Sequence, residues 1–274
     1  MIKLLNAGFT RLRKSKLFCI LTIFSIVFAL CMIYTQYSDM KKYGSVIEVE
    51  QIMLNYATMI GIIIAIFTSL FLGVEYSDGA IRNKISIGHK RISIYLSNFI
   101  ITTITSLYSY ILFVVIVVII GIPLFGGITI ANSKLLMLIG SIFVNIIAYS
   151  SIFTFIAMMI SNKTITAIVS IMLAFGLMMT ALTCIKILDT SKTVTQATMI
   201  NGETKIEEIP NPKYPSEPKK KVFQTLLDIN PSGQMFQIAG RTDPNLKVLP
   251  LYSLGIVVIF TGVGLMIFNK KELK

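Results

Sequence analysis

The sequence predicts an all-α polytopic membrane protein with six transmembrane helices, and three observations support this fold class. First, 54% of the 274 residues are hydrophobic and only 14% are charged, whereas soluble domains carry about 25% charged residues. Second, six apolar stretches approach the roughly 20 residues that a helix needs to cross a bilayer. Third, these stretches are unbroken, so they lack the alternation of a membrane β-barrel.

We expect one transmembrane domain over residues 1–274. The six spans are predicted at 17–36, 51–73, 94–121, 135–160, 165–187 and 249–268. Around them lie an N-terminal segment, an outer segment between the fifth and sixth spans, and a short tail, at 1–16, 188–248 and 269–274. The third stretch is longer than a span requires, which predicts a tilt or a projection into water.

The N-terminal segment 1–16 has the pattern of an amphipathic helix. Its apolar residues share one helical face, and basic residues supply the rest: Ile2, Leu5, Phe9 and Leu12 against Lys3, Arg11, Arg13, Lys14 and Lys16. This pattern favours a helix in the membrane interface, with its ammonium groups near lipid phosphates. The alternative is a basic tail without helical order that only sets the topology.

The distribution of Lys and Arg predicts that both termini are cytoplasmic. With that orientation the inner segments hold 13 of the 25 Lys and Arg residues but only three of the 13 acids. Those segments are 1–16, 74–93, 161–164 and 269–274. The net charge of +12 is therefore explained by topology. No basic stripe with interleaved aromatic residues indicates a nucleic-acid partner.

The inner loop 74–91, VEYSDGAIRNKISIGHKR, is polar although apolar runs flank it. Ser77 or Asp78 can cap a short helix, and Gly88 can close it in the left-handed conformation. We expect a two-turn helix parallel to the membrane that presents Ile81 and Ile85 on one face. Such a short helix is unstable alone in water, which favours a soluble partner with a groove.

The outer segment 188–248 is too long to be a simple connection. Asn201-Gly202 favours a type I′ turn, and hence a β-hairpin. Beyond a proline-rich stretch we expect two short amphipathic helices, the second starting at Asn230-Pro231 and ending near Gly240. These helices would dip into the outer interface or cover a vestibule. The alternative is a peripheral loop without a role in substrate handling.

Catalytic chemistry has no candidate in this sequence. The predicted spans contain no Asp, Glu, Arg or His, with only Lys186 near an end, which argues against a proton antiporter. A phosphate-binding G-x-x-x-x-G-K-[ST] motif is absent, and the three cysteines lack metal spacing. Polar residues in the third and fourth spans suit helix packing, with a substrate path as the alternative: Thr102, Thr105, Ser106, Ser109, Asn145 and Ser151.

The stretch from Glu75 to Lys84, EYSDGAIRNK, resembles the cytoplasmic loop between spans two and three of type-2 ABC transporter permeases. These are bacterial exporter subunits that include a lantibiotic- and bacitracin-resistance group. An acidic residue followed by Gly-Thr-Ile-Arg is common in that loop, and Ala80 replaces the threonine here. The resemblance extends over nearly the whole chain: a basic amphipathic start, six spans and a large outer segment before the sixth.

This resemblance implies the permease subunit of an ATP-driven exporter in the bacterial cytoplasmic membrane. The chain would not be an enzyme and would hold no cofactor, because ATP and Mg²⁺ bind in a separate ABC ATPase. Two ATPase copies and a second permease, identical or similar, complete the working unit, surrounded by membrane lipid. The substrate would be amphipathic, such as an antimicrobial peptide, a drug or a lipid-like molecule.

The resemblance also implies a coupling helix at about 77–87 that docks on the ATPase. Ile81 and Ile85 would form the docking face, Arg82 and Lys84 would pair with acids of the ATPase, and Glu75 would lock the base of the loop. Two other classes of function stay open from the sequence. One is a membrane anchor or sensor that binds a soluble partner, and the other is a channel or ion-coupled carrier.

Overall fold

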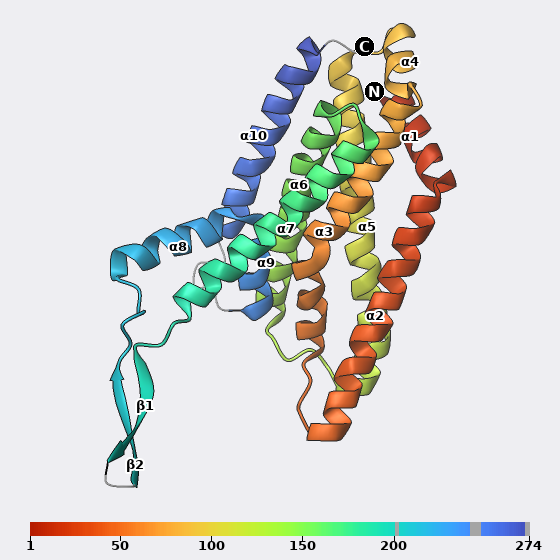
Figure 1. Ribbon diagram of the computed structural model, residues 1–274. Helices are drawn as coiled ribbons and strands as arrows, with labels where there is room; N and C mark the ends of the chain where they lie inside the picture. The colour runs from red at the N-terminus through yellow and green to blue at the C-terminus, as the bar shows by residue number, and fades with distance from the viewer. Residues whose placement is uncertain (201–202, 242–247, 272–274) are drawn as a thin grey trace.

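A computed structural model describes residues 1–200, 203–241 and 248–271 of the chain. Six helices in the described part are long and apolar enough to cross a membrane, and they lie side by side in one bundle (Figure 1). Their bounds are α2 Lys16–Tyr43, α3 Val49–Ser77, α5 Arg91–Phe125, α6 Asn132–Met159, α7 Lys163–Leu188 and α10 Leu249–Lys270. The predicted all-α polytopic architecture is confirmed.

Most of these helices extend beyond the predicted spans, because helical hydrogen bonding continues into the flanking polar residues. The extension changes the interpretation of α3 most. It begins at Val49 and ends at Ser77, so it contains Glu50 and Glu75, which both lie outside the predicted span 51–73. Their exposed fractions are 0% and 2%. Two buried carboxylates therefore belong to a spanning helix that we expected to be free of them.

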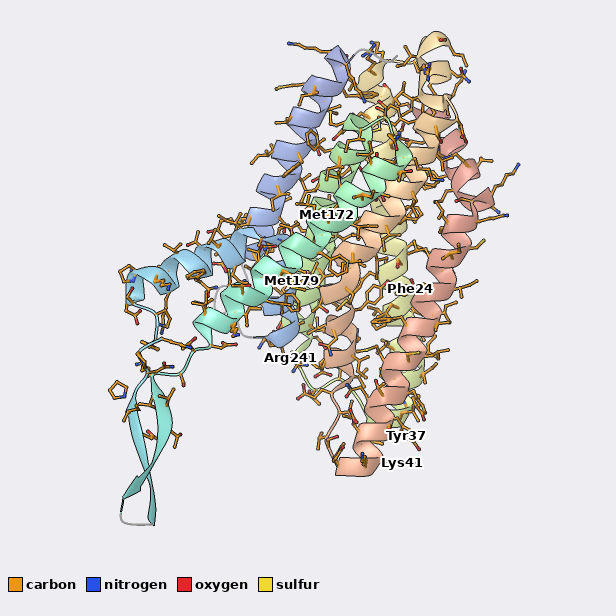
Figure 2. The ribbon with its side chains drawn as sticks, in the orientation of Figure 1. Phe24, Tyr37, Lys41, Met172, Met179 and Arg241 are labelled. Atoms are coloured by element: carbon orange, nitrogen blue, oxygen red, sulfur yellow. The ribbon has the colours of Figure 1, made fainter. Side chains whose placement is uncertain are left out.

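Helices α3 and α6 form the centre of the bundle. Helix α3 packs against α2, α5, α6 and α7, and its Tyr56 ring stacks on Phe113 of α5 with centroids 4.3 Å apart. The outer faces of α2, α7 and α10 instead expose large apolar side chains, such as Met172 and Met179 of α7 (Figure 2). This distribution suits a bundle whose solvent is lipid.

The two chain ends and two short helices lie at one end of the bundle, which we call the inner end (Figure 1). Helix α1 spans Ile2–Lys14 and α4 spans Ala80–Ser86. The buried face of α1 is Leu4, Gly8 and Leu12, whereas Ile2 is 75% exposed. The apolar stripe is thus turned relative to our expectation, because α1 packs on α5 with Gly8 facing Ile101.

The opposite, outer end carries the segment before the last span. Strands β1 Thr193–Ile200 and β2 Glu203–Pro210 pair antiparallel, with Thr193 opposite Pro210 and Ile200 opposite Glu203. The Asn201-Gly202 turn that we predicted lies outside the described residues. Helices α8 Glu217–Ile229 and α9 Pro231–Gly240 follow, and α9 lies within the bundle, in contact with α3, α6 and α7.

Candidate functional site

The inner loop contains a seven-residue helix, α4, with a glycine at each side. Gly79 and Gly88 have φ of 68° and 93°, conformations in which a side chain would be strained. Ser77 and Asp78 do not cap α4 as we expected, because α3 runs on through Ser77 and Asp78 is its C-terminal cap. The reversal from α3 to α4 therefore depends on Gly79 rather than on a polar cap.

The structure changes the apolar face assigned to this loop. Ile81 is 1% exposed and belongs to a buried cluster with Phe71, Tyr76 and Ile94. Ile85 is partly buried against the same cluster, whereas Ile87 is 78% exposed. Because Ile81 fixes the loop to its own bundle, the large apolar side chain that α4 and its C-terminal turn offer to a partner is Ile87.

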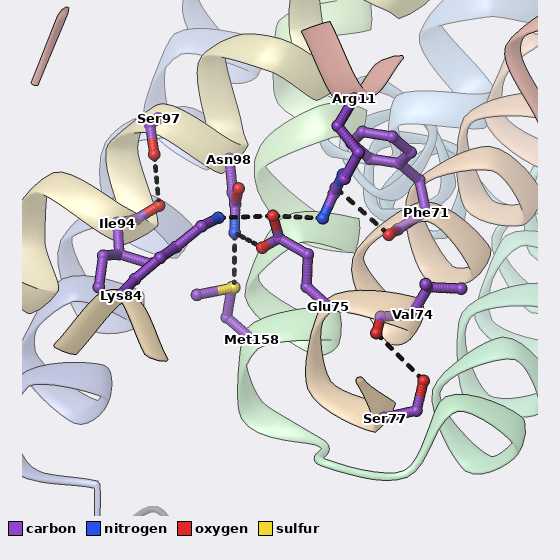
Figure 3. Close-up of polar contacts among 10 residues, drawn as sticks. All are labelled: Arg11, Phe71, Val74, Glu75, Ser77, Lys84, Ile94, Ser97, Asn98 and Met158. Carbon is purple, nitrogen blue, oxygen red and sulfur yellow. Dashed lines mark hydrogen bonds and ion pairs between the residues drawn. The ribbon is translucent and has the colours of Figure 1, made fainter. Parts of the chain in front are cut away.

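Glu75 lies at the base of the loop and joins four helices (Figure 3). Its Oε1 is bonded by Arg11 of α1 and by Lys84 of α4, whose Nζ lies 2.6 Å away. Its Oε2 accepts a hydrogen bond of 2.8 Å from Asn98 Nδ2 of α5. A carboxylate buried to this degree must be paired, and here the partners come from α1, α4 and α5.

This arrangement separates the two basic residues that we assigned to ATPase acids. Lys84 is paired with Glu75 inside the chain, because α4 folds back over the end of α3. Arg82 is exposed and has no acid within ion-pair distance in the described part of the chain. Sequence reasoning missed Arg11 as a partner of Glu75, since 64 positions separate the two residues and nothing in the pattern connects them.

A second set of inner contacts satisfies carbonyl groups at the ends of spanning helices. Arg91 of α5 donates to the carbonyls of Phe268 and Lys271 at the end of α10. Lys271 Nζ donates to the carbonyls of Met158 and Met159 at the end of α6, at 3.2 and 3.0 Å. Cations are favourable at these negative helix ends, although burial lowers the pKa of the Lys271 ammonium.

At the outer end, α8 and α9 form a wedge whose tip reaches the middle of the bundle. Asn230 at the tip caps α9, since its Oδ1 accepts from Ser232 N at 2.9 Å, and its Nδ2 donates to the carbonyl of Leu177 in α7. Asn145 of α6 donates to the carbonyl of Pro231 at 3.0 Å. The wedge is therefore built into the spans, which is deeper than the interfacial position we expected.

The other polar contacts that the tip of the wedge makes with α6 and α10 are also between neutral groups. Asn145 Nδ2 donates to Gln234 Oε1 at 2.9 Å, and that oxygen also accepts from Ser253 of α10. Tyr149 and Ser232 share a hydroxyl contact of 2.5 Å. The ion pairs of the wedge lie away from its tip: Lys220 is 3.9 Å from Glu217 within α8, and Arg241 (Figure 2) meets Glu48 before α3 at the far end of α9.

The six residues proposed for packing or a substrate path are all buried, with exposed fractions of 0–3%. Ser109 contacts the hydroxyls of Tyr56 and Ser25 at 2.7 and 2.8 Å, and Thr102 contacts Thr154 at 3.0 Å. Ser151, Thr105 and Ser106 donate to carbonyls of their own helices, and Asn145 binds the wedge. In this conformation every one of them has a packing role, and the substrate path stays a prediction.

The described residues contain no group of three or more His, Cys, Asp or Glu placed to hold a metal ion. This geometry supports the transmission of motion rather than a chemical reaction. The surface helix α4 is tied by an ion pair to Glu75 of α3, and Glu75 in turn binds α1 through an ion pair and α5 through a hydrogen bond. A buried wedge occupies the other end of the bundle. Among protein families, the family described as ABC-2 family transporter protein matches residues 4–187 of the chain. No curated protein matches the sequence.

Proposed function

The chain belongs to the ABC-2 family of transporter proteins, and from this premise we propose that it is an exporter permease driven through its inner loop. Membership makes the chain a multi-pass membrane protein and the membrane component of an ABC transporter, which implies an ABC ATPase as partner. The proposal adds that the ATPase docks on α4 and that its closure moves the loop.

The observation that supports this proposal best is the Glu75 network. A soluble partner can transmit force only through a loop that does not swing freely. The loop here is fixed by Ile81 in the inner cluster and by Lys84 on Glu75. Since Glu75 also binds Arg11 and Asn98, displacement of α4 pulls on α1, α3 and α5 together.

The proposed docking surface is the exposed side of α4 and the turn that follows it. It comprises Arg82, Asn83, Ser86, Ile87 and Lys90, all of which are exposed. An apolar anchor beside cations suits a groove rimmed by acids on the ATPase. Compared with the sequence-based hypothesis, Arg82 stays on this surface, Ile87 replaces Ile81 as anchor, and Lys84 serves the internal pair.

The working unit in this proposal has two ATPases, which bind ATP and Mg²⁺, and two permeases, identical or similar. Both termini face the cytoplasm of a bacterial cell, in agreement with the basic excess at the inner end. Outward transport, an amphipathic substrate and kinship with lantibiotic- and bacitracin-resistance exporters follow from the sequence resemblance and belong to the proposal.

Copurification in mild detergent tests the docking surface. We expect Arg82→Glu and Ile87→Asp each to reduce ATPase recovered with the chain by roughly tenfold, because a desolvated anchor or charge pair at an interface centre is worth 1–3 kcal/mol. Lys134→Glu and Val46→Asp are matched controls, since both residues are exposed at the outer end.

Full recovery of the ATPase with both inner variants would refute docking at this surface. Equal losses with the outer controls would also count against it, since they would indicate a general effect of added acids. Ile81→Asp is unsuitable for this test, because a carboxylate at a buried position destabilises the chain itself.

A further inference from the structure

A cavity of about 540 Å³ lies at the outer end between the spans and the wedge. This size falls in the range of sites for drug-sized molecules. Its walls come from α3, α7, α8 and α9, and the lining includes Gln51, Asn55, Leu182, Asp189, Gln224 and Phe236. Apart from Asp189, every lining residue is neutral.

The hydrogen bonds of the cavity fix the orientation of its glutamine amides. Gln224 and Gln237 both direct Nε2 at Asp228 Oδ1, at 2.7 and 3.0 Å. Gln51 directs Nε2 at the carbonyl of Ala239, at 2.8 Å. Carboxylates and carbonyls only accept hydrogen bonds, so the opposite orientation of these amides would place oxygen against oxygen.

These bonds determine which polar atoms remain for a ligand. Gln237 Oε1 accepts from Gln224 Nε2, while Gln51 Oε1 and Gln224 Oε1 have no partner among the described residues and are not sealed from solvent. The Asn55 amide nitrogen is the remaining lining donor, since the Thr58 hydroxyl donates to its own helix. The lining therefore offers mainly acceptors.

Two carboxylates lie beside this cavity. Asp189 is at the rim and Asp228 is behind the two glutamines. In the described residues neither carboxylate has a Lys or Arg within ion-pair distance. The nearby Lys220 of α8 is bonded to Tyr214 and lies 3.9 Å from Glu217. A chain with net charge +12 thus keeps two unpaired acids beside this cavity.

We propose that the cavity binds an organic cation with an apolar body. Its ammonium group would donate to Gln51 Oε1, Gln224 Oε1 and the Asp189 carboxylate, while its body packs on the apolar wall that includes Leu182 and Phe236. The assignment as a substrate class rests on the proposed transport function, but binding itself does not, because all of these residues belong to this chain.

Fluorescence titration of the purified chain in lipid nanodiscs, without an ATPase, tests the site. The probe is dansylcadaverine, a primary ammonium linked to an apolar fluorophore, and the comparison ligand is dansylglycine, which carries a carboxylate. We expect saturable, blue-shifted binding of dansylcadaverine above that of empty nanodiscs, and much weaker binding of dansylglycine. Leu182→Trp should abolish saturable binding by filling the cavity.

Asp189→Asn should reduce the affinity of the chain for dansylcadaverine about three- to fivefold, which is the effect of losing one solvent-accessible charge pair. Asp39→Asn is the matched control, because Asp39 is exposed on α2 and outside the cavity, and it should leave the affinity unchanged. Equal weakening by the two variants, or equal binding of the two dansyl compounds, would overturn the proposal. Absence of binding with normal ATPase copurification would refute the cation site alone.

Discussion

The Glu75 network at the inner end and the tip of the wedge at the outer end are held in place by different chemistry. The inner end uses charges: Glu75 binds Arg11 and Lys84, and Arg91 and Lys271 cover helix-terminal carbonyls. The tip of the wedge binds α6 and α7 through neutral amides, hydroxyls and carbonyls. The difference follows depth, because the cost of desolvating an ion exceeds that of an amide severalfold.

The exposure of the inner cations explains how this end keeps a buried carboxylate. The Arg11 and Lys84 side chains are 31% and 20% exposed, while Glu75 is 2% exposed. Each cation thus reaches water while it neutralises the acid. Asn145 of α6 and Gln234 of the wedge are buried and have no such access to water, so ions at these positions would be unfavourable. We infer that the inner contacts allow α4 to move, whereas the contacts of the wedge hold α8 and α9 in a fixed position.

The largest effect is expected from Glu75→Gln. This change keeps the shape and the bond with Asn98 but leaves Arg11 and Lys84 without an acid, and breaking a buried ion pair costs about 3 kcal/mol. Thermal denaturation in detergent should show a lower midpoint, and hydrogen exchange should rise over α1 and α4.

Asp78→Asn provides the control for this prediction. Asp78 is also an acid of the same loop, but it is exposed and has no cation partner within ion-pair distance among the described residues. Its replacement should leave the midpoint of thermal denaturation unchanged within measurement error. If the two variants lost equal stability, net charge rather than the Glu75 network would hold the inner end.

The same contrast explains which parts of the structure the sequence could predict. The spans follow from apolar runs, whereas the cytoplasmic orientation of the inner end stays a prediction from the placement of Lys and Arg. The partner of Glu75 could not be predicted, because nothing in the sequence distinguishes Arg11 from the neighbouring Arg13, which is exposed. The depth of the wedge could not be predicted either. Asn230 and Gln234 are equally compatible with a surface helix, and the sequence does not show that Asn145 of α6 contacts this segment.

The apolar face of α4 shows a further reason for errors of this kind. Ile81 and Ile85 lie one turn apart, and that spacing predicts a shared face but not what the face packs against. In the structure Ile81 packs on the bundle that α4 belongs to. A helix of seven residues has little stability by itself, so its apolar face packs on the nearest apolar surface, which here belongs to the same chain.

A smaller effect is expected from Gly233→Ala in the wedge. A Cβ atom at this position would lie 2.2 Å from the carbonyl oxygen of Leu227, and a backbone atom cannot rotate away. We expect a loss of about 2 kcal/mol, as for other overpacked sites, and faster proteolysis between α8 and α9. Gly8→Ala at the inner end is the control: its Cβ would meet Ile101 Cδ1, which is the far end of a flexible side chain.

The contrast with Gly8 makes this prediction informative about the two ends. Helix α1 should accept the methyl group with a rotamer change of Ile101 and little loss of stability. If Gly8→Ala proved as damaging as Gly233→Ala, the inner end would be as rigid as the wedge. The inference that the ends differ in mobility would then be wrong.

The smallest effect is expected from Asn145→Leu. The leucine has a similar volume and removes the hydrogen bonds to the Pro231 carbonyl and to Gln234. Gln234 Oε1 keeps its bond from Ser253, so only the Pro231 carbonyl loses a partner, and bonds between membrane helices are worth about 1 kcal/mol. Hydrogen exchange over α9 should rise, while α1 and α4 stay protected.

Ser150→Ala, in α6 like Asn145, is the control, because the buried Ser150 hydroxyl has no partner among the described residues and its removal should not reduce stability. Increased exchange at α4 in Asn145→Leu would show that the two ends are coupled through α6, and the depth-based separation of a moving end from a fixed end would fail.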